Sequence, residues 1–407
     1  MARVIVIGGG AGGILAAGRA AECGAKVVLL EKNSTLGKKL RITGKGRCNV
    51  TNTADKNEFV EAFGSNGKFL YGAFSRFSNQ DLRDLLERLG VPTKVERGGR
   101  VFPASDRADD IASALEKWLK ELKVDIRVGT VAKGLKIEDG RVVGVDVFGG
   151  TMRADAVILA TGGITYPQTG STGDGYRMAG EVGHKIVIPI PSLAALEVGE
   201  SWVSQLQGLS LKNVRVTLMA GGKKVGQQFG EMLFTHFGVS GPIILTLSKT
   251  YITLKEKEDV VISINMKPAI TREQLEARLL GDFTDTKFFK NYLPELLPRT
   301  FIPVFMQLSG IPADTSLNTI THDQRKKILS LLLDFKLTVT SARAADEAIV
   351  TSGGIPIGEI DSRTMESKLV AGLFFCGEVI DIDAVTGGYN LQAAFSTGWV
   401  AGESAAQ

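Results

Sequence analysis

The chain has 407 residues, of which 44% are hydrophobic and 23% are charged, and its formal net charge is +4. These values are typical of a globular protein with two or three well-filled domains, and they exclude a disordered or low-complexity chain. The modest positive charge suits an anionic cofactor and does not by itself indicate a nucleic-acid partner.

Cysteine and histidine usage narrows the chemistry further. Cys23, Cys48 and Cys376 lie far apart, and the three histidines have no ligand spacing. We therefore expect no disulfide scaffold and no metal site, and a reducing cytoplasmic location. No apolar run reaches the length of a membrane span, so we expect neither a signal peptide nor a membrane anchor.

The N-terminal segment predicts a unit that binds a dinucleotide. An apolar run at residues 4–7 enters a glycine-rich turn, Gly8-Gly9-Gly10-Ala11-Gly12-Gly13, and a second apolar run ends at Glu31. Gly8 permits the turn, Gly10 lets backbone N–H groups approach a pyrophosphate, and Gly13 lets the helix lie close to the strand. The phosphates would lie at the helix N-terminus, and Glu31 would accept a hydrogen bond from each hydroxyl of the adenosine ribose. NAD and FAD both satisfy this pattern.

A cationic loop follows at residues 37–52, with five Lys or Arg side chains and three glycines, so it can fold closely around an anion. Helical periodicity covers 81–89 and 109–122, and residues 124–147 are predicted to form a β-meander. The apolar strand 156–160 lacks polar alternation, which is typical of a buried strand in a parallel sheet.

The character of the chain changes near Val187. Strand signals appear at 214–219 and 260–264, and a helical stretch covers roughly 271–335. The parallel-sheet pattern returns in two short apolar runs, at 348–351 and 373–376. We therefore predict three segments: a first part of a nucleotide-binding domain (1–187), an inserted β-rich and helical substrate or lid domain (188–344), and the second part of the nucleotide-binding domain (345–407).

The C-terminal segment favours FAD over NAD. A strand ends at Gly377-Glu378, and Gly387-Gly388 leads into a second helix near Asn390. A flavin dinucleotide needs one helix N-terminus at its pyrophosphate and another at the N1/C2-carbonyl edge of the ring, where the reduced ring is negatively charged. NAD has no such requirement.

Several stretches resemble a known family. The chain is similar to the bacterial FAD-dependent oxidoreductases that include the 3-dehydro-bile-acid reductases and the aminoacetone oxidases. The matching stretches span nearly the whole chain in family order: 8–13, 43–52, 166–175, 231–236, 240–242, 364–368 and 387–392. Lys45 stands where the family usually has a third glycine. The resemblance implies an α/β fold, in which a two-dinucleotide-type FAD-binding Rossmann-like domain with a β-meander is interrupted by an inserted β-rich and helical domain.

The motifs and the resemblance together predict the residues that bind FAD. The resemblance places Lys38 and Arg41 on the phosphate side of the cofactor and the segment 44–49 near the flavin ring. Asp174 is either a helix N-cap or a flavin-side acceptor, and Glu378 or Asp381 would bond a ribityl hydroxyl. The full predicted set is Gly8, Gly10, Ala11, Gly12, Gly13, Glu31, Lys32, Lys38, Arg41, Gly44, Gly46, Arg47, Cys48, Asn49, Ala160, Thr161, Gly162, Gly163, Asp174, Gly377, Glu378, Asp381, Gly388, Asn390, Leu391 and Gln392.

Two side chains are candidates for proton transfer. His236 lies in a motif-like setting between Thr235 and Ser240, and Tyr166 would act from the opposite wall of the site. A structural histidine is the alternative for His236. Cys48 has no partner cysteine, so we interpret it as a small packing residue rather than a nucleophile.

The expected function is a cytoplasmic FAD-dependent oxidoreductase that uses NAD(P)H to reduce an unsaturated or carbonyl-bearing small molecule. No second GxGxxG motif is present, so NAD(P)H would bind transiently. One alternative is an amine oxidase of the aminoacetone type that passes electrons to O₂ and forms hydrogen peroxide. A second is a tRNA-directed flavoprotein, which the dispersed basic residues and the 7% aromatic content argue against. The substrate, the nicotinamide preference and the oligomeric state stay open.

Overall fold

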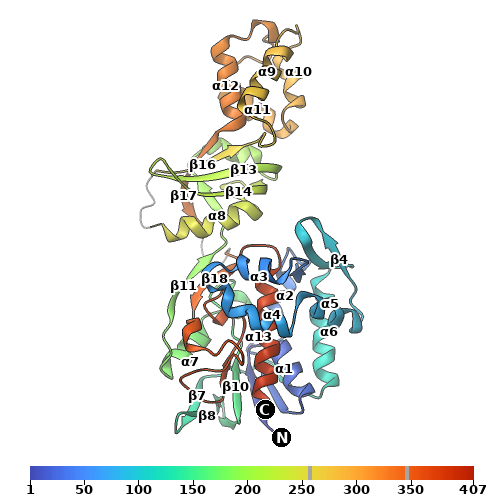
Figure 1. Cartoon of the computed structure of the whole chain (residues 1–407), viewed down its shortest axis with the longest axis vertical. Coiled ribbons are helices and arrows are strands. Elements are labelled where there is room, and N and C mark those ends of the chain that lie inside the picture. Colours follow the sequence, from blue (N-terminus) through green and yellow to red (C-terminus); the bar gives the residue numbers. More distant parts are fainter. Residues whose placement is uncertain (255–258, 344–347) are drawn as a thin grey trace. The chain divides into compact units, whose positions relative to one another are not determined.

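The computed structural model describes residues 1–254, 259–343 and 348–407, and its contacts divide the chain into two compact units. Unit 1 contains Met1–Pro191 and Ala345–Gln407, and unit 2 contains Ser192–Ala344. Figure 1 shows the helices and strands of each unit.

Unit 1 is built on a five-stranded parallel sheet in the order β19-β10-β1-β2-β6. Its strands are β1 (Arg3–Ile7), β2 (Lys26–Leu30), β6 (Asp125–Arg127), β10 (Ala156–Leu159) and β19 (Leu373–Phe375). The three central strands read as apolar runs because both faces of the sheet are covered, and Val4, Val6 and Leu29 are fully buried.

Helices α1 (Ala11–Glu22) and α13 (Tyr389–Ala405) pack tightly against each other in unit 1 (Figure 1). Small residues allow this approach. A Cβ on Gly398 would lie 2.2 Å from the carbonyl oxygen of Gly12, and one on Gly402 would lie 2.3 Å from that of Ala16. The N-terminal and C-terminal parts of unit 1 therefore share one core.

The other elements of unit 1 surround this core. Its further helices are α2 (Lys38–Ile42), α3 (Lys56–Ala62), α4 (Tyr71–Arg76), α5 (Asn79–Arg88), α6 (Ala108–Glu121) and α7 (Asp174–Glu181). A small sheet has the order β3-β5-β4, with β3 (Thr51–Asn52), β4 (Thr93–Glu96) and β5 (Arg100–Pro103). The β-meander consists of β7 (Gly134–Glu138), β8 (Arg141–Val147) and β9 (Gly150–Arg153).

Two strand predictions were wrong in detail. Residues 125–127 do not belong to the meander, because β6 pairs with β2 as an edge of the parallel sheet. The run at 348–351 does not rejoin that sheet either. It enters β18 (Val350–Gly354), which pairs with β11 (Val187–Ser192) in a separate two-stranded sheet.

Unit 2 contains a closed barrel of six strands in the order β12-β15-β14-β13-β16-β17. The strands are β12 (Leu196–Val198), β13 (Ser210–Ala220), β14 (Lys223–Phe234), β15 (Gly238–Ser240), β16 (Val260–Asn265) and β17 (Phe335–Ala342). Apolar residues alternate with polar ones along β16 and β17, so that Ile262, Ile264 and Leu337 are fully buried. Helix α8 (Pro242–Thr253) packs against β14.

A group of helices lies between β16 and β17 in the sequence. It comprises α9 (Arg272–Asp282), α10 (Phe289–Tyr292), α11 (Ile302–Ser309) and α12 (His322–Leu333). Capping boxes begin α9 at Thr271 and α12 at Thr321, each with a glutamine three residues later. The predicted fold class, a Rossmann-like unit with a meander and a β-rich, helical insertion, is confirmed.

In the part of the chain that the structure describes, no helix is both long enough and apolar enough to span a membrane.

Candidate functional site

The N-terminus of α1 is open to an anion. Gly10 is its N-cap, no side chain caps the helix, and the first turn holds no acidic residue. A Cβ on Gly10 would have no heavy atom within 4 Å, so there is open space beside the N-cap of this helix, whose first residue is Ala11. Such an end attracts negative charge through its unpaired donors and its dipole.

The neighbouring glycines have a packing role. Gly8 has φ +107°, and a Cβ on Gly13 would lie only 1.8 Å from the carbonyl oxygen of Gly8. A Cβ on Gly12 would meet the carbonyl oxygen of Ala394 at 3.1 Å and the sulfur of Cys376 at 3.2 Å. Gly8 and Gly13 therefore hold the helix against the strand, and Gly12 faces α13.

Glu31 is buried at the end of β2, and the protein itself engages its carboxylate. Its Oε2 accepts from the Gly9 N–H at 2.8 Å, and its Oε1 accepts from the N–H and the side-chain amide of Asn33, both at 2.7 Å. A carboxylate has about four acceptor positions. The geometry leaves room for about one ribose hydroxyl, where the sequence predicted bonds to both.

Cations near this end of the sheet have protein partners. Lys32 donates to Asp174 and to Thr172, both at 2.6 Å. Asp174 is the first residue of α7, whose N-cap is Gly173, so Asp174 does not cap that helix. Arg41 pairs with Asp109, and Lys38 is exposed at the start of α2.

The loop at residues 44–49 turns back on itself, with positive φ at Gly44, Gly46 and Cys48. Cys48 is fully buried, and burial raises the pKa of its thiol to about 12, which fits the packing role and excludes a reactive thiolate. Asn49 differs, because its Oδ1 is buried without a hydrogen-bond partner among the described residues.

The side chain of Arg47, predicted to lie near the flavin ring, is bonded to neighbouring acidic residues. It donates to Glu96 and to Asp106, and its guanidinium lies 4.3 Å from the centroid of the Phe102 ring. Hydrogen bonds from Lys94 and Arg47 lower the pKa of Asp106, and the hydrogen bond from Arg47 lowers that of Glu96.

The exit of strand β10 contains a second orphaned polar atom. Ala160 is buried, and the Thr161 hydroxyl that follows is buried without a partner among the described residues. Gly162 has φ +71°, and a Cβ on Gly163 would lie 2.1 Å from the hydroxyl oxygen of Thr351. Gly163 therefore lets the chain lie close to β18.

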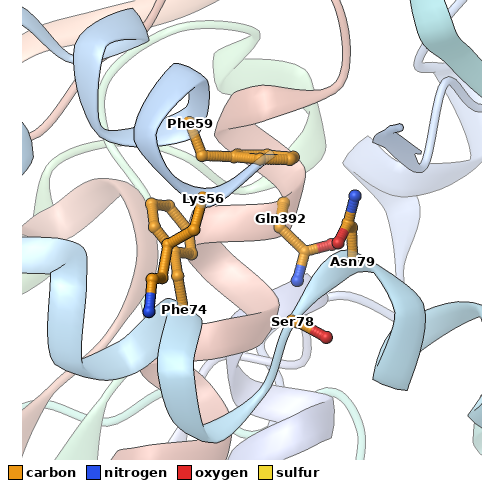
Figure 2. A pocket seen from close by; sticks show the side chains of 6 residues that line it. All are labelled: Lys56, Phe59, Phe74, Ser78, Asn79 and Gln392. Atoms are coloured by element: carbon orange, nitrogen blue, oxygen red, sulfur yellow. The ribbon is translucent and has the colours of Figure 1, made fainter. Parts of the chain in front are cut away.

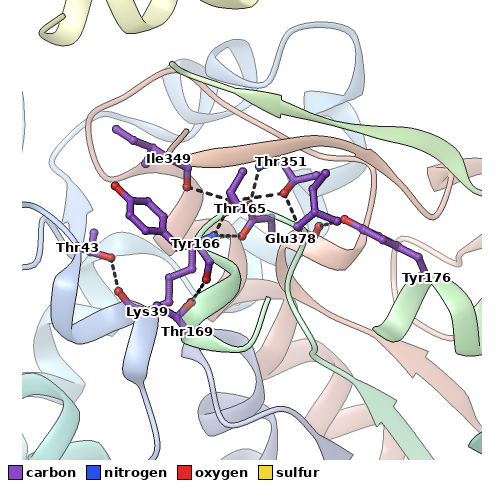
Figure 3. Close-up of polar contacts among 10 residues, drawn as sticks. Lys39, Thr43, Thr165, Tyr166, Thr169, Tyr176, Ile349, Thr351 and Glu378 are labelled. Carbon is purple, nitrogen blue, oxygen red and sulfur yellow. Dashed lines mark hydrogen bonds and ion pairs between the residues drawn. The ribbon is translucent and has the colours of Figure 1, made fainter. Parts of the chain in front are cut away.

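Glu378 joins segments that are distant in the sequence, as Figure 3 shows. Its Oε2 accepts from the Lys39 ammonium at 2.7 Å, and its Oε1 accepts from the Thr351 N–H at 2.6 Å and the Thr165 hydroxyl at 3.3 Å. Lys39 also donates to Thr165 at 3.0 Å. We call Lys39, Thr165, Thr351 and Glu378 the Glu378 network.

Sequence reasoning named Glu378 in this network and missed the other three residues. Lys39 stands beside Lys38 in a run of cations, and only the course of the short helix α2 decides which of the two turns inward. No sequence signal separates them. Gly377, which precedes Glu378, has φ +74° and donates its N–H to the Thr397 hydroxyl at 3.0 Å.

The N-terminus of α13 is also uncapped. Gly388 is its N-cap with φ +98°, and neither a side-chain cap nor an acidic residue occupies its first turn. A Cβ on Gly388 would lie 2.3 Å from the carbonyl oxygen of Thr51, so glycine is required there. This end comes from the C-terminal segment, and α13 packs on α1.

Other predicted residues on and before α13 serve the protein's own structure. Asn390 clamps the preceding loop, accepting from the Ala384 N–H at 2.8 Å. The Asp381 carbonyl accepts from Asn66, and Leu391 is half-buried. Gln392 is buried, accepts from Thr51 at 2.7 Å, and lines a small pocket between α3, α4 and α13 (Figure 2). The other residues lining that pocket are Lys56, Phe59, Phe74, Ser78 and Asn79.

Unit 1 as a whole fits a flavin dinucleotide. The uncapped N-termini of α1 and α13, the open space at Gly10, and two buried side-chain oxygens without partners among the described residues, on Asn49 and Thr161, all belong to this unit. Buried polar atoms are nearly always hydrogen-bonded in folded proteins. Such atoms among the predicted cofactor residues indicate that a ligand completes their hydrogen bonds.

The two candidate proton donors lie in different units. Tyr166 belongs to unit 1, with φ +53°, and directly follows Thr165 of the Glu378 network. His236 belongs to unit 2, where it is exposed in the turn between β14 and β15 and contacts the Phe237 ring edge to face at 4.9 Å between ring centroids. His184 is a structural histidine, buried between Glu359 and Ser367, each at 2.8 Å.

Comparisons with known proteins agree with this geometry. A family model described as the HI0933-like protein Rossmann domain matches residues 2–404. The 3-dehydro-bile acid delta(4,6)-reductase of Clostridium scindens is 31% identical over 413 residues, covering 100% of both chains. A ribosomal RNA dihydrouridine synthase of Escherichia coli is 30% identical over 97% of this chain and 96% of its own.

Solved structures share the fold at lower identity. A 3-ketosteroid-delta4-(5alpha)-dehydrogenase from Rhodococcus jostii aligns with a TM-score of 0.56 at 16% identity, over 100% of this chain and 97% of its own. A flavocytochrome c3 fumarate reductase aligns with a TM-score of 0.56 at 18% identity, over 100% of this chain and 78% of its own.

Proposed function

Because the chain belongs to the HI0933-like family and is an FAD-dependent oxidoreductase, we propose that it reduces a carbon–carbon double bond conjugated to a carbonyl group in a small molecule, with NADH or NADPH as the electron donor. One observation carries the proposal. The bile-acid reductase and the dihydrouridine synthases, which match over 97–100% of the chain, are both named for adding hydrogen to an unsaturated ring. FAD supplies hydride transfer when it is bound.

We assign the cofactor to unit 1. The N–H groups at Gly10, Ala11 and Gly12 would bind the pyrophosphate, and Glu31 would accept from the ribose. The N-terminus of α13 would face the carbonyl edge of the flavin ring. Thr161 and Asn49, whose side-chain oxygens lack other partners among the described residues, would complete their hydrogen bonds on the cofactor. In this arrangement Arg47 and Gln392 support the site through protein contacts.

Reduction of a conjugated double bond adds a proton as well as a hydride, so a side chain must hold a proton near the substrate. We assign this role to Tyr166, because it lies in unit 1 next to the Glu378 network. His236, exposed in the β14–β15 turn of unit 2, is the alternative donor. General acid catalysis of this kind contributes about 10²–10⁴-fold to a rate.

An anaerobic experiment tests the proposal. The yellow holoprotein is mixed with NADH or NADPH while flavin absorbance is followed, and a 3-oxo-4-ene steroid is then added. Bleaching by the nucleotide and recovery on adding the steroid, with the saturated product detected by mass spectrometry, support the reductase. Bleaching by aminoacetone alone, with peroxide formed on admitting air, would replace the proposal with the oxidase.

The same experiment distinguishes the two proton donors. Tyr166→Phe should bleach normally with NAD(P)H and slow the steroid-dependent recovery about 10²-fold. His236→Asn should leave both phases unchanged. The opposite pattern assigns the proton to His236.

Ribosomal RNA is a second candidate substrate. The dihydrouridine synthases of Escherichia coli and Haemophilus influenzae are 30% and 28% identical over 97% of this chain. The uracil ring also holds a double bond conjugated to a carbonyl, so one chemistry would serve both substrates. The test incubates the reduced holoprotein with unmodified ribosomal RNA and measures nucleosides by mass spectrometry. A uridine that gains two hydrogens supports this candidate, and unchanged uridine excludes it.

A further inference from the structure

The β13–β14 hairpin of unit 2 presents a mixed cationic and aromatic outer face. In its register Arg215 stands opposite Phe229, and Thr217 stands opposite Gln227. Side chains alternate along a strand, and Val214, Val216 and Leu218 are buried, so Arg215 and Thr217 face outward. Phe229 is 58% exposed on this outer face. Figure 1 shows β13 and β14 side by side in the barrel.

Charge on the hairpin is one-sided. Lys212, Arg215, Lys223 and Lys224 are exposed, and none forms an ion pair among the described residues. Within residues 210–234 Glu231 is the only acidic residue, and it accepts a hydrogen bond from Ser210.

Several cations elsewhere in unit 2 are paired with acids. Examples are the pairs Arg278–Asp282, Lys287–Glu295, Lys290–Asp314 and Lys336–Asp334. The hairpin instead leaves its positive charge available to a partner.

Neighbouring strands extend this face with hydrogen-bonding groups. Asn265 of β16 stands beside Arg215, and Ser263 stands beside Thr217. On β14, Lys224 donates to Gln227 at 2.7 Å, and Gln227 donates to Thr217 at 3.0 Å. The outer face therefore combines an exposed aromatic ring, amide and hydroxyl groups, and cations without paired acids.

We propose that this outer face of the β13–β14 hairpin binds single-stranded RNA, with a base stacked on Phe229 and phosphates held by Arg215 and Lys224. The inference rests on the ribosomal RNA candidate above. Base stacking on an aromatic ring together with cations along the backbone is the general means by which proteins hold single strands. An acidic protein is the alternative partner. It would pair with the cations, but it would offer no base to stack on the exposed ring.

The test measures binding of a fluorescein-labelled single-stranded oligouridine to the FAD-loaded full-length protein by anisotropy, across a salt series. Phe229→Ala should weaken binding about 10-fold. Arg215→Ala should also weaken it and lower the slope of log K against log salt by about 0.7. Two matched variants serve as controls. Phe148→Ala removes a ring that is 91% exposed in unit 1, and Arg299→Ala removes an exposed arginine elsewhere in unit 2. Both should bind like the parent.

Three results would overturn the inference. They are a parent protein that fails to bind the oligouridine at low salt, control variants that weaken binding as much as the test variants, and weaker binding by Arg215→Ala with unchanged binding by Phe229→Ala. The last result would indicate a general polyanion site. Reduction of the steroid by NAD(P)H in Phe229→Ala and Arg215→Ala is measured in parallel. Variants that still reduce the steroid but no longer bind RNA support the inference. A parent protein that does not reduce the steroid counts against the proposed function alone.

Discussion

The Lys39 ammonium lies 2.7 Å from the Glu378 carboxylate, so two residues 339 positions apart in the chain form one ion pair. The same carboxylate accepts from Thr351 of β18 and from Thr165 after β10. Three of its roughly four acceptor positions are thus filled by protein. As at Glu31, about one position stays available to a hydroxyl group of a ligand.

The Glu378 network should influence cofactor affinity. Lys39→Met removes the ion pair and leaves the Glu378 carboxylate held only by Thr351 and Thr165. We expect the dissociation constant of FAD to rise about 5-fold, as for a partly exposed pair. Titration of apoprotein with FAD, followed by flavin fluorescence, measures this. Lys68→Met, at an exposed lysine outside the site, is the matched control. Equal affinities for the parent and Lys39→Met would show that the network does not act on the cofactor.

Two glycines of the same turn should fail in different ways when changed to alanine. Gly13→Ala places a Cβ 1.8 Å from the Gly8 carbonyl oxygen and should cost about 3 kcal/mol of folding free energy. Gly10→Ala meets nothing within 4 Å, so stability should change by less than about 0.5 kcal/mol. Its methyl group would nevertheless occupy the open space beside the helix N-cap and weaken FAD binding. Urea unfolding and FAD titration of both variants measure these effects, and unweakened FAD binding by Gly10→Ala would contradict the assignment of the pyrophosphate to this end.

Thiol reactivity should follow burial. Cys48 and Cys376 are buried, and burial raises the pKa of each thiol to about 12, whereas Cys23 is exposed. We expect iodoacetamide at mildly alkaline pH to label only Cys23 in the native apoprotein and all three cysteines after denaturation. Peptide mass spectrometry identifies the labelled sites. Rapid native labelling of Cys48 would overturn its assignment as a packing residue.

Asp106 should stabilise unit 1 in a pH-dependent way. Hydrogen bonds from Lys94 and Arg47 lower its folded pKa below the ordinary value of 3.8. A lowered folded pKa gives stability that is present above the unfolded pKa and is lost as the pH falls through the folded one. The parent should therefore melt at a higher temperature than Asp106→Asn at neutral pH, and the difference should shrink below about pH 4. A difference that is constant across this range would show that the charge of Asp106 contributes nothing.

Sequence patterns predicted the architecture well where one physical constraint dominated. The first strand, turn and helix depend on Gly8 and Gly13, because a Cβ at either position would collide with the backbone. The strands at 125–127 and 350–354 were misplaced for a different reason. Both are short, and the neighbour that a short strand selects depends on tertiary packing rather than on its own residues.

Prediction of the candidate site was less complete, because charged side chains choose among several partners. Arg47, in the cationic loop, and Lys32, before that loop, were predicted to bind the cofactor, and the fold supplies both with acids, Asp106 and Asp174. Lys39, which the sequence did not single out, reaches Glu378. The basic hairpin was also missed, because its cations are dispersed in the sequence and only the β13–β14 register brings them together.

The pairing of β11 with β18 bears on how this protein could diversify. These strands lead out of unit 1 and back into it, and they are hydrogen-bonded neighbours. To the cofactor-binding core, the whole inserted module is therefore equivalent to one loop between two paired strands. An ancestral enzyme could exchange that module for another without moving a single strand of its parallel sheet, which gives evolution a route to new substrates on an unchanged redox core.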